Sequence, residues 1–262
     1  APFEEEVRGF EKAGSMLAAA GKKRMNELLD DAARVITVSS ALAGYLAERY
    51  GVKKEKITVT PNCVDPGAVN VSPAKAEQLR RKYFPGKKTV IGFVGSIFPY
   101  HGVDILIRAF AELHRQHSET GLFIVGDGYL IPELKELASA LGCGDSVVFT
   151  GSVPHADIFD HIAAMDITVM ADSNWYGSPV KIFEYGCAGK PVIAPDTVPV
   201  RDVMENGTDG LLVKPGKNEL LSALLQMMND PEKTSGMARH FREKIVSTCT
   251  WKRAAEKALL SL

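Results

Sequence analysis

Hydrophobic and polar positions alternate in regular blocks from about residue 89 onward. Short apolar runs, typical of buried parallel strands, are separated by longer segments with the spacing of amphipathic helices. The strands are predicted at 90–95, 122–125, 147–150, 167–170, 191–194 and 210–213. The helices between them are predicted at 103–114, 132–141, 156–165, 180–187 and 199–205. This alternation predicts an α/β fold with a doubly wound, six-stranded parallel sheet, whose ligand crevice lies at the carboxyl ends of the strands.

The first 65 residues follow a different pattern. After a charged, mostly helical stretch, they predict a strand at 34–38, a helix at 41–50 ended by Gly51, and a strand at 56–60. Two strands are too few for an independent α/β sheet. We therefore expect the tail of a second, partial α/β domain whose beginning is absent, followed by the main domain over 66–248. The segment 64–88 is predicted as linker with a basic surface helix, and helices are predicted at 219–228, 231–246 and 251–262.

The stretch from 172 to 194 carries the most chemistry. A strand leads into a polar loop with Gly177, Ser178 and Pro179, and the next helix begins near Val180. The start of such a helix offers free amide groups and a partial positive charge to an anion. Lys181 adds a full charge in the first turn. Glu184 lies one turn further along the helix, within reach of hydroxyl groups on the bound molecule. We therefore interpret this stretch as the binding site for a nucleotide diphosphate.

Four other motifs each allow a functional and a structural interpretation. Gly95 and Ser96 end the first strand of the main sheet in a two-glycine pattern that fits either phosphate approach or tight strand-to-helix packing. His101 is either a phosphate donor at the next helix or an ordinary surface histidine. Trp175 and Tyr176 are either a platform for a sugar or an aromatic pair that anchors the loop. Gly151, Ser152 and Val153 either border a base or form a turn and helix cap.

Composition and charge limit the classes of partner that the chain is expected to bind. The net charge of −1 and the pI near 6.7 give no field that would favour nucleic acid or a membrane surface. No apolar run approaches the roughly 20 residues of a membrane span. The four cysteines are far apart in sequence, which indicates a reduced, cytoplasmic setting, and no cysteine or histidine spacing predicts a metal site.

Seven segments occur together in an order that is typical of one family. The segments are Val35-Ile-Thr-Val-Ser-Ser40, Ile57-Thr-Val-Thr-Pro-Asn-Cys-Val-Asp65, Phe93-Val-Gly-Ser-x-x-Pro-x-His-Gly-Val-Asp104, Ile124-Val-Gly-Asp-Gly128, Phe149-Thr-Gly-Ser-Val153, Ser178-Pro-Val-Lys-Ile-Phe-Glu-Tyr185 and Gly189-Lys-Pro-Val-Ile-Ala194. With these segments in this order, the chain resembles the nucleotide-binding half of the family 4 retaining glycosyltransferases, which have the two-domain GT-B fold.

The resemblance implies roles for the residues already singled out. The chain would move a hexose from a UDP- or GDP-sugar to an unknown carbohydrate, lipid or small-molecule acceptor, with retention and without a metal or other cofactor. Glu184, the second acid of the family's E-x7-E pattern, would hold the ribose, and the loop from Gly177 to Lys181 would face the diphosphate. Residues 151–153 would border the base. Tyr176, Lys181 and Glu184 are the expected catalytic positions.

Three departures from the family pattern qualify these expectations. Tyr176 stands where the first acid of the pattern is expected, and Ser96 and His101 replace a basic pair. Residues 1–65 would be only a remnant of the acceptor domain, with 249–262 as the helix that crosses back onto it. We therefore expect weak nucleotide binding and poor turnover from this chain, pairing between chains through uncovered apolar surface, and membrane contact only through the absent part. The alternatives are a nucleotide-sugar 2-epimerase and a non-catalytic nucleotide-sugar-binding module.

Overall fold

A computed structural model describes residues 16–260 and contains the predicted six-stranded sheet. All neighbouring strands are parallel. The strand order is β5-β4-β3-β6-β7-β8. The strands are β3 (Thr89–Val94), β4 (Thr120–Val125), β5 (Val147–Phe149), β6 (Ile167–Val169), β7 (Val192–Pro195) and β8 (Leu211–Val213). The predicted fold class is therefore confirmed.

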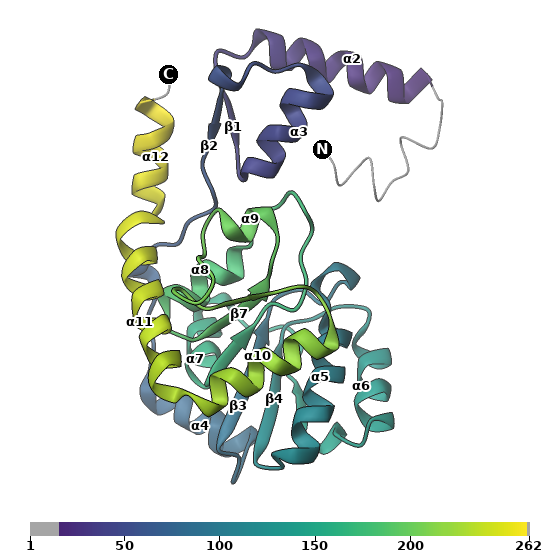
Figure 1. Ribbon diagram of the computed structural model, residues 1–262, viewed down its shortest axis with the longest axis vertical. Helices are drawn as coiled ribbons and strands as arrows, with labels where there is room; N and C mark the ends of the chain where they lie inside the picture. Colours follow the sequence, from purple (N-terminus) through teal and green to yellow (C-terminus); the bar gives the residue numbers. More distant parts are fainter. Residues whose placement is uncertain (1–15, 261–262) are drawn as a thin grey trace.

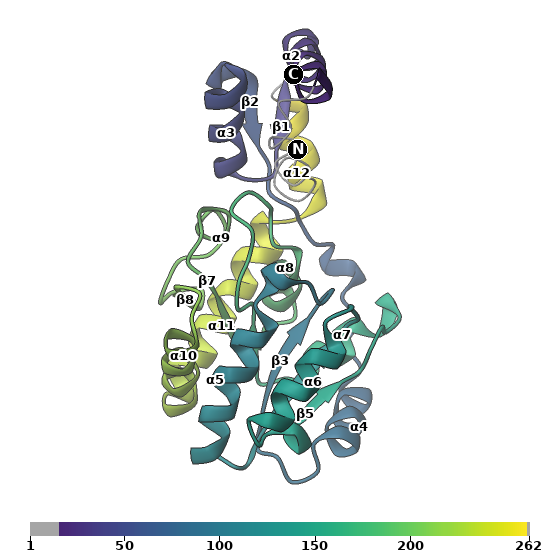
Figure 2. The same ribbon diagram turned by 90° about the vertical axis from the view of Figure 1, so that its right-hand side faces the viewer.

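Helices cover both faces of this sheet, and each face has its own hydrophobic core (Figures 1 and 2). Side chains alternate along the strands, so Ile91 and Phe93 enter one core while Val90 and Val94 enter the other. One face is covered by α5 (Val103–Gln116), α6 (Ile131–Ala140) and α10 (Lys217–Asn229). The other is covered by α4 (Pro73–Tyr83), α7 (Ile158–Ala163), α8 (Val180–Cys187), α9 (Val198–Arg201) and α11 (Pro231–Thr248).

Two of the predicted helices are shorter than expected. The segment predicted at 156–165 begins as a 3-10 turn, His155–Asp157, and continues as α7 only to Ala163. The helix does not continue through Asp166, because the Asp166 amide donates to Val90 O of β3 at 2.7 Å. This hydrogen bond already belongs to the pairing of β6 with β3. The helix predicted at 199–205 is α9, which ends at Arg201.

The order of the strands reverses between β3 and β6. Chain connections leave these two neighbouring strands toward opposite faces, and a crevice opens at their carboxyl ends. The loop after β3 contains Gly95, Ser96 and His101, whereas the loop after β6 leads to the start of α8. The topology alone thus brings together two loops that are about 80 residues apart in sequence.

A smaller unit lies beyond these carboxyl ends (Figure 1). It contains α2 (Met16–Asp31), β1 (Val35–Thr37), α3 (Ser40–Tyr50) and β2 (Ile57–Val59), and its two strands pair in parallel. Ser39 caps α3 through Leu42 N, and Gly51 ends it in a left-handed conformation, as the sequence predicts. Helix α12 (Trp251–Leu260) runs beside β2 in Figure 1, and Lys257 Nζ donates to Val59 O at 2.7 Å.

Candidate nucleotide-binding site

A cavity of about 390 Å³ lies at the carboxyl ends of β3 and β6. Its walls contain most of the residues that the sequence predicted for a diphosphate site. These are Gly95, Ser96, His101, Gly177, Ser178, Pro179, Val180, Lys181 and Glu184. Residues that belong to two separate sequence motifs therefore share one cavity, at the place where a doubly wound sheet binds ligands.

The two glycines at the end of β3 have different surroundings. A Cβ at Gly92 would lie 1.9 Å from Met165 Sδ, so this glycine serves tight packing inside the domain. Gly95 has φ +141° and lies in the cavity wall, where a Cβ would meet Lys181 Cε at 3.0 Å. The packing interpretation thus applies to Gly92. Gly95, which has no side chain, leaves room for Lys181 beside the backbone.

Lys181 places a positive charge against the cavity from the first turn of α8. Its Nζ lies 5.2 Å from the centre of the Phe93 ring. Within residues 16–260 its ammonium group makes neither a hydrogen bond nor an ion pair. Burial lowers the pKa of Lys181 to about 8, against the opposing attraction of Glu184. An anion in the cavity would supply the missing partner and would favour the charged form of the lysine.

Glu184 lies one turn after Lys181 and faces the same cavity. Burial raises the pKa of its carboxyl group, while His155 and Lys181 act in the opposite direction. Its carboxylate has no hydrogen-bond donor in the described part of the chain. A half-buried carboxylate without a donor is suited to accept hydrogen bonds from ligand hydroxyls.

His101 is held in a neutral form. Its Nδ1 lies 2.5 Å from Ser96 O, and since a carbonyl oxygen only accepts, Nδ1 carries the proton. Burial and the charge of Lys181 lower the pKa of His101 to about 4. In the neutral ring Nε2 is an acceptor, so His101 donates to a phosphate only after taking up a second proton.

Four residues predicted for the site do not line this cavity: Tyr176, Gly151, Ser152 and Val153. The carbonyl group of Tyr176 accepts a hydrogen bond from Ser39 Oγ at 2.6 Å, which ties the loop to the smaller unit. Its neighbour Trp175 packs on Tyr45 of α3, with ring centres 5.5 Å apart. The Trp175 ring and the Tyr176 backbone therefore anchor the loop, and a sugar platform made by the two rings stays a prediction. Gly151 O accepts from Gly126 N at 3.1 Å, and these three residues stay a prediction for the base.

The segment after β2 reaches the cavity wall from the other side. The Asn62 amide donates to Ser178 Oγ at 2.9 Å, and Asn62 Nδ2 donates to Ser178 O at 3.1 Å. The hydroxyl and the carbonyl group of Ser178 are thereby fixed just before α8 begins. No local pattern in the sequence predicted this contact, because its partners are 116 residues apart.

Further lining residues were also missed by the sequence interpretation. Tyr100 comes from the loop after β3, and Ser173 and Asn174 come from the loop after β6. Asn174 Oδ1 accepts from Gly177 N at 2.7 Å and so shapes the loop before α8. Asparagine followed by a nearby glycine is a turn signal that would have marked this residue.

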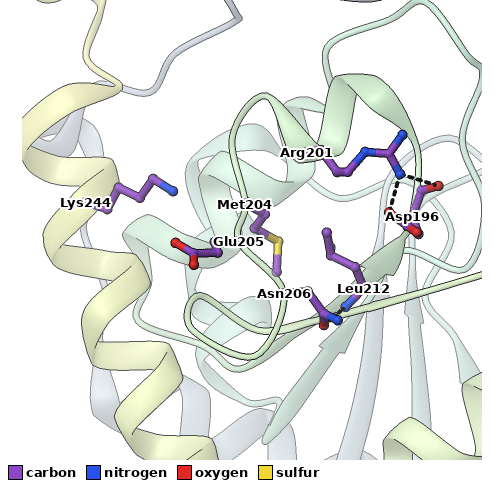
Figure 3. Close-up of a pocket in the computed structure, with 7 residues that line it drawn as sticks. All are labelled: Asp196, Arg201, Met204, Glu205, Asn206, Leu212 and Lys244. Carbon is purple, nitrogen blue, oxygen red and sulfur yellow. Dashed lines mark hydrogen bonds and ion pairs between the residues drawn. The ribbon is translucent and has the colours of Figure 1, made fainter.

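A second cavity, of about 570 Å³, lies beside α9, β8 and α11 (Figure 3). Three of its four charged wall residues, Asp196, Arg201 and Lys244, are already paired, whereas Glu205 has no ion-pair partner among residues 16–260. Arg201 lies 2.5 Å from Asp196, and Lys244 lies 2.6 Å from the buried Asp209. None of the residues predicted for the site lines it. The cavity at α8, which holds most of the predicted residues together with Lys181 and Glu184, both unpaired in the described chain, is therefore the candidate ligand site.

Residues 16–260 contain no group of three or more histidine, cysteine, aspartate or glutamate residues arranged to hold a metal ion. None of their helices combines the length and the apolar character needed to cross a membrane.

Comparisons with known proteins place this geometry in context. A family model described as glycosyl transferases group 1 matches residues 75–244, and one described as glycosyltransferase family 4 matches residues 4–68. A 2-deoxystreptamine glucosyltransferase of Streptomyces kanamyceticus is 30% identical over 217 residues, covering 81% of this chain and 55% of that protein. A GDP-mannose-dependent alpha-(1-6)-phosphatidylinositol monomannoside mannosyltransferase of Mycobacterium tuberculosis is 26% identical over 260 residues. The match covers 96% of this chain and 66% of that protein.

A solved structure agrees with the fold. HepE of Anabaena, in complex with UDP, superimposes with a TM-score of 0.80 at 25% identity, over 88% of this chain and 64% of that one. The chain thus spans between about half and two thirds of the length of these relatives.

Proposed function

The chain belongs to the family of group 1 glycosyl transferases, and on this premise we propose that its six-stranded unit binds the nucleotide-sugar donor of a retaining hexosyl transfer. The observation that carries the proposal is the meeting of three features in one cavity. They are the free amino end of α8, the unpaired ammonium group of Lys181 and the carboxylate of Glu184. A nucleoside diphosphate has complementary groups, with two phosphates for the first two features and ribose hydroxyls for the third.

The same groups would assist the reaction. When the bond between sugar and diphosphate breaks, negative charge grows on the leaving phosphate. Lys181 and the amide groups at the start of α8 line the cavity proposed to hold this phosphate, so they would stabilise the transition state without reorganisation. Glu184 would hold the ribose and thereby fix the donor sugar for attack. Because these groups meet the charge requirement, we propose that no metal takes part.

The nucleotide of the donor is proposed to be UDP or GDP, and the acceptor is not yet identified. The two curated relatives are named for 2-deoxystreptamine and for a phosphatidylinositol mannoside, which both contain a hydroxylated six-carbon ring. A cyclitol is therefore the first acceptor class to test, with the chain in its full-length context.

The test is a calorimetric titration of the chain with UDP, GDP, ADP and inorganic pyrophosphate. We expect one of UDP and GDP to bind best, and pyrophosphate to bind more weakly at the same site. Glu184→Ala should weaken binding of the nucleotide and leave pyrophosphate unaffected, because Glu184 is assigned to the ribose. Glu243→Ala, which removes an exposed carboxylate on α11, is the matched control. Equal losses for nucleotide and pyrophosphate would contradict this assignment.

A second function, donor binding without transfer, is favoured by one observation. Tyr176 occupies the position of the expected first acid and lies outside the cavity walls. If a full-length protein binds the nucleotide but transfers no sugar to any cyclitol, and Tyr176→Glu restores transfer, the non-catalytic reading is correct. Transfer by the unmodified protein excludes it, and a sugar epimerised at C2 without acceptor would indicate an epimerase.

A further inference from the structure

The described chain passes twice between the small unit and the six-stranded unit (Figures 1 and 2). The first passage follows β2, and the second lies between α11 and α12. The two passages touch, because Val64 and Thr250 form a parallel bridge and Val64 N donates to Cys249 O at 3.1 Å. This contact marks the junction between the units.

Each passage carries a cysteine one residue before the bridge. Since Val64 is opposite Thr250, the parallel register places Cys63 opposite Cys249. Paired backbones are about 4.8 Å apart, and opposed side chains in parallel pairing point to the same side. Disulfides need Cα atoms about 4.4–6.8 Å apart with side chains facing one another, so this register is compatible with a bond.

Two observations support the proximity of the thiols. Cys63 and Cys249 line one cavity, of about 490 Å³, at the junction. Burial raises the pKa of the Cys63 thiol to about 11, and the charge of Cys249 contributes to this rise. Cys63 is buried, whereas Cys249 is partly exposed. The remaining cysteines, Cys143 and Cys187, are buried in the two separate cores of the sheet.

We propose that Cys63 and Cys249 form a reversible disulfide that locks the junction between the two units. The oxidant is a low-molecular-weight disulfide such as oxidised glutathione. The more accessible Cys249 attacks it as a thiolate, forms a mixed disulfide and releases one glutathione thiolate. Cys63 then loses its proton and attacks the Cys249 sulfur, releasing the second glutathione. Two protein thiols are oxidised, and one glutathione disulfide is reduced to two thiols.

The cross-link acts on the candidate site through a neighbouring residue. Asn62 precedes Cys63 and holds Ser178 in the cavity wall. Locking Cys63 in place therefore restricts the segment that positions the start of α8. This last step rests on the proposed function, whereas the disulfide itself does not.

The experiment incubates the full chain with buffers of graded glutathione redox potential, followed by alkylation and peptide mapping. We expect two of the four cysteines to be protected, in one peptide pair that joins residue 63 to residue 249 within a monomer. The oxidised chain should melt about 5 °C or more above the reduced one, because a long loop is closed. Cys63→Ser and Cys249→Ser should each abolish both effects, while Cys143→Ala should keep them.

Absence of the joined peptide pair, or its appearance only between two chains, would overturn the proposal. A cross-link that forms with no change in UDP or GDP affinity would keep the disulfide and remove its influence on the cavity. A chain that forms the cross-link but binds no nucleotide would argue against the proposed function alone.

Discussion

The six-stranded unit and the small unit are held together by different forces. The sheet is enclosed by two continuous cores, with fully buried side chains such as Phe93, Phe110 and Phe241. The small unit has no buried residue in α3, and Ile36 in its central strand pair is 52% exposed. It meets the larger unit through hydrogen bonds to the loop before α8 and to Asp202 just after α9, and through the ring contact between Tyr45 and Trp175. The stability of the fold should therefore depend on one unit, while the precision of the cavity depends on both.

The largest expected effect is a loss of stability from the core. Phe241 packs against the backbone of α8, since a Cβ at Gly186 would lie 2.7 Å from its ring. Phe241→Ala should reduce the free energy of unfolding by about 3–5 kcal/mol, because it leaves a cavity that cannot collapse. Ile36→Ala in the small unit should cost about 1 kcal/mol or less. Urea unfolding of both variants measures this contrast, and equal losses would refute it.

The next effect concerns the unpaired charge. Lys181→Met keeps most of the side-chain volume but removes the ammonium group from the cavity. The affinity for UDP or GDP should fall by roughly 10- to 100-fold, which is the value of a charge-assisted contact of about 1.5–3 kcal/mol. Lys217→Met removes a surface lysine that pairs with Glu112, and it should leave the affinity unchanged. Retention of full affinity by Lys181→Met would exclude its role at the diphosphate.

A smaller effect tests the contribution of the small unit. Asn62→Ala removes the hydrogen bond from Asn62 Nδ2 to Ser178 O and keeps the one from the backbone amide, so the start of α8 is held less firmly. We expect nucleotide affinity to fall about 3- to 10-fold, in line with roughly 1 kcal/mol for neutral hydrogen bonds.

The matched control for Asn62 lies on the same interface. Ser40 donates to Asp202 at 2.7 Å through its amide and its hydroxyl, away from the cavity walls. Ser40→Ala should disturb the contact between the units and leave calorimetric affinity unchanged. If both variants lose affinity equally, the seating of the small unit, and not Asn62 itself, shapes the cavity.

Local patterns in the sequence predicted the sheet and the charged turn of α8. Apolar runs and helix signals are local, and the reversal of strand order fixes where their ends meet. Thus Lys181 and Glu184, three residues apart on one helix, share a cavity with Gly95 and Ser96. The contacts that the sequence did not predict are long-range. Asn62 with Ser178, and Ser39 with Tyr176, are 116 and 137 residues apart, and no periodicity records such pairs.

The smallest expected effect is a pH dependence. It separates nucleotide affinity from folding stability, because the two should change in opposite directions. The pKa of Lys181 is about 8 in the folded chain, against an ordinary value of 10.5. Because an anion needs the charged lysine, nucleotide affinity should fall about fourfold between about pH 7 and about pH 8.5, with the phosphates of the ligand already ionised.

Folding stability should change in the opposite direction. Between about pH 8 and about pH 10.5 the unfolded chain keeps the proton that the folded chain has released, so stability gained from this group rises with pH. Lys181→Met should remove both slopes. Calorimetry from about pH 7 to about pH 8.5 and urea unfolding from about pH 8 to about pH 10.5 measure the two slopes. Two slopes of the same sign in the wild-type chain, both lost in Lys181→Met, would mean that Lys181 supports the fold and does not serve a ligand.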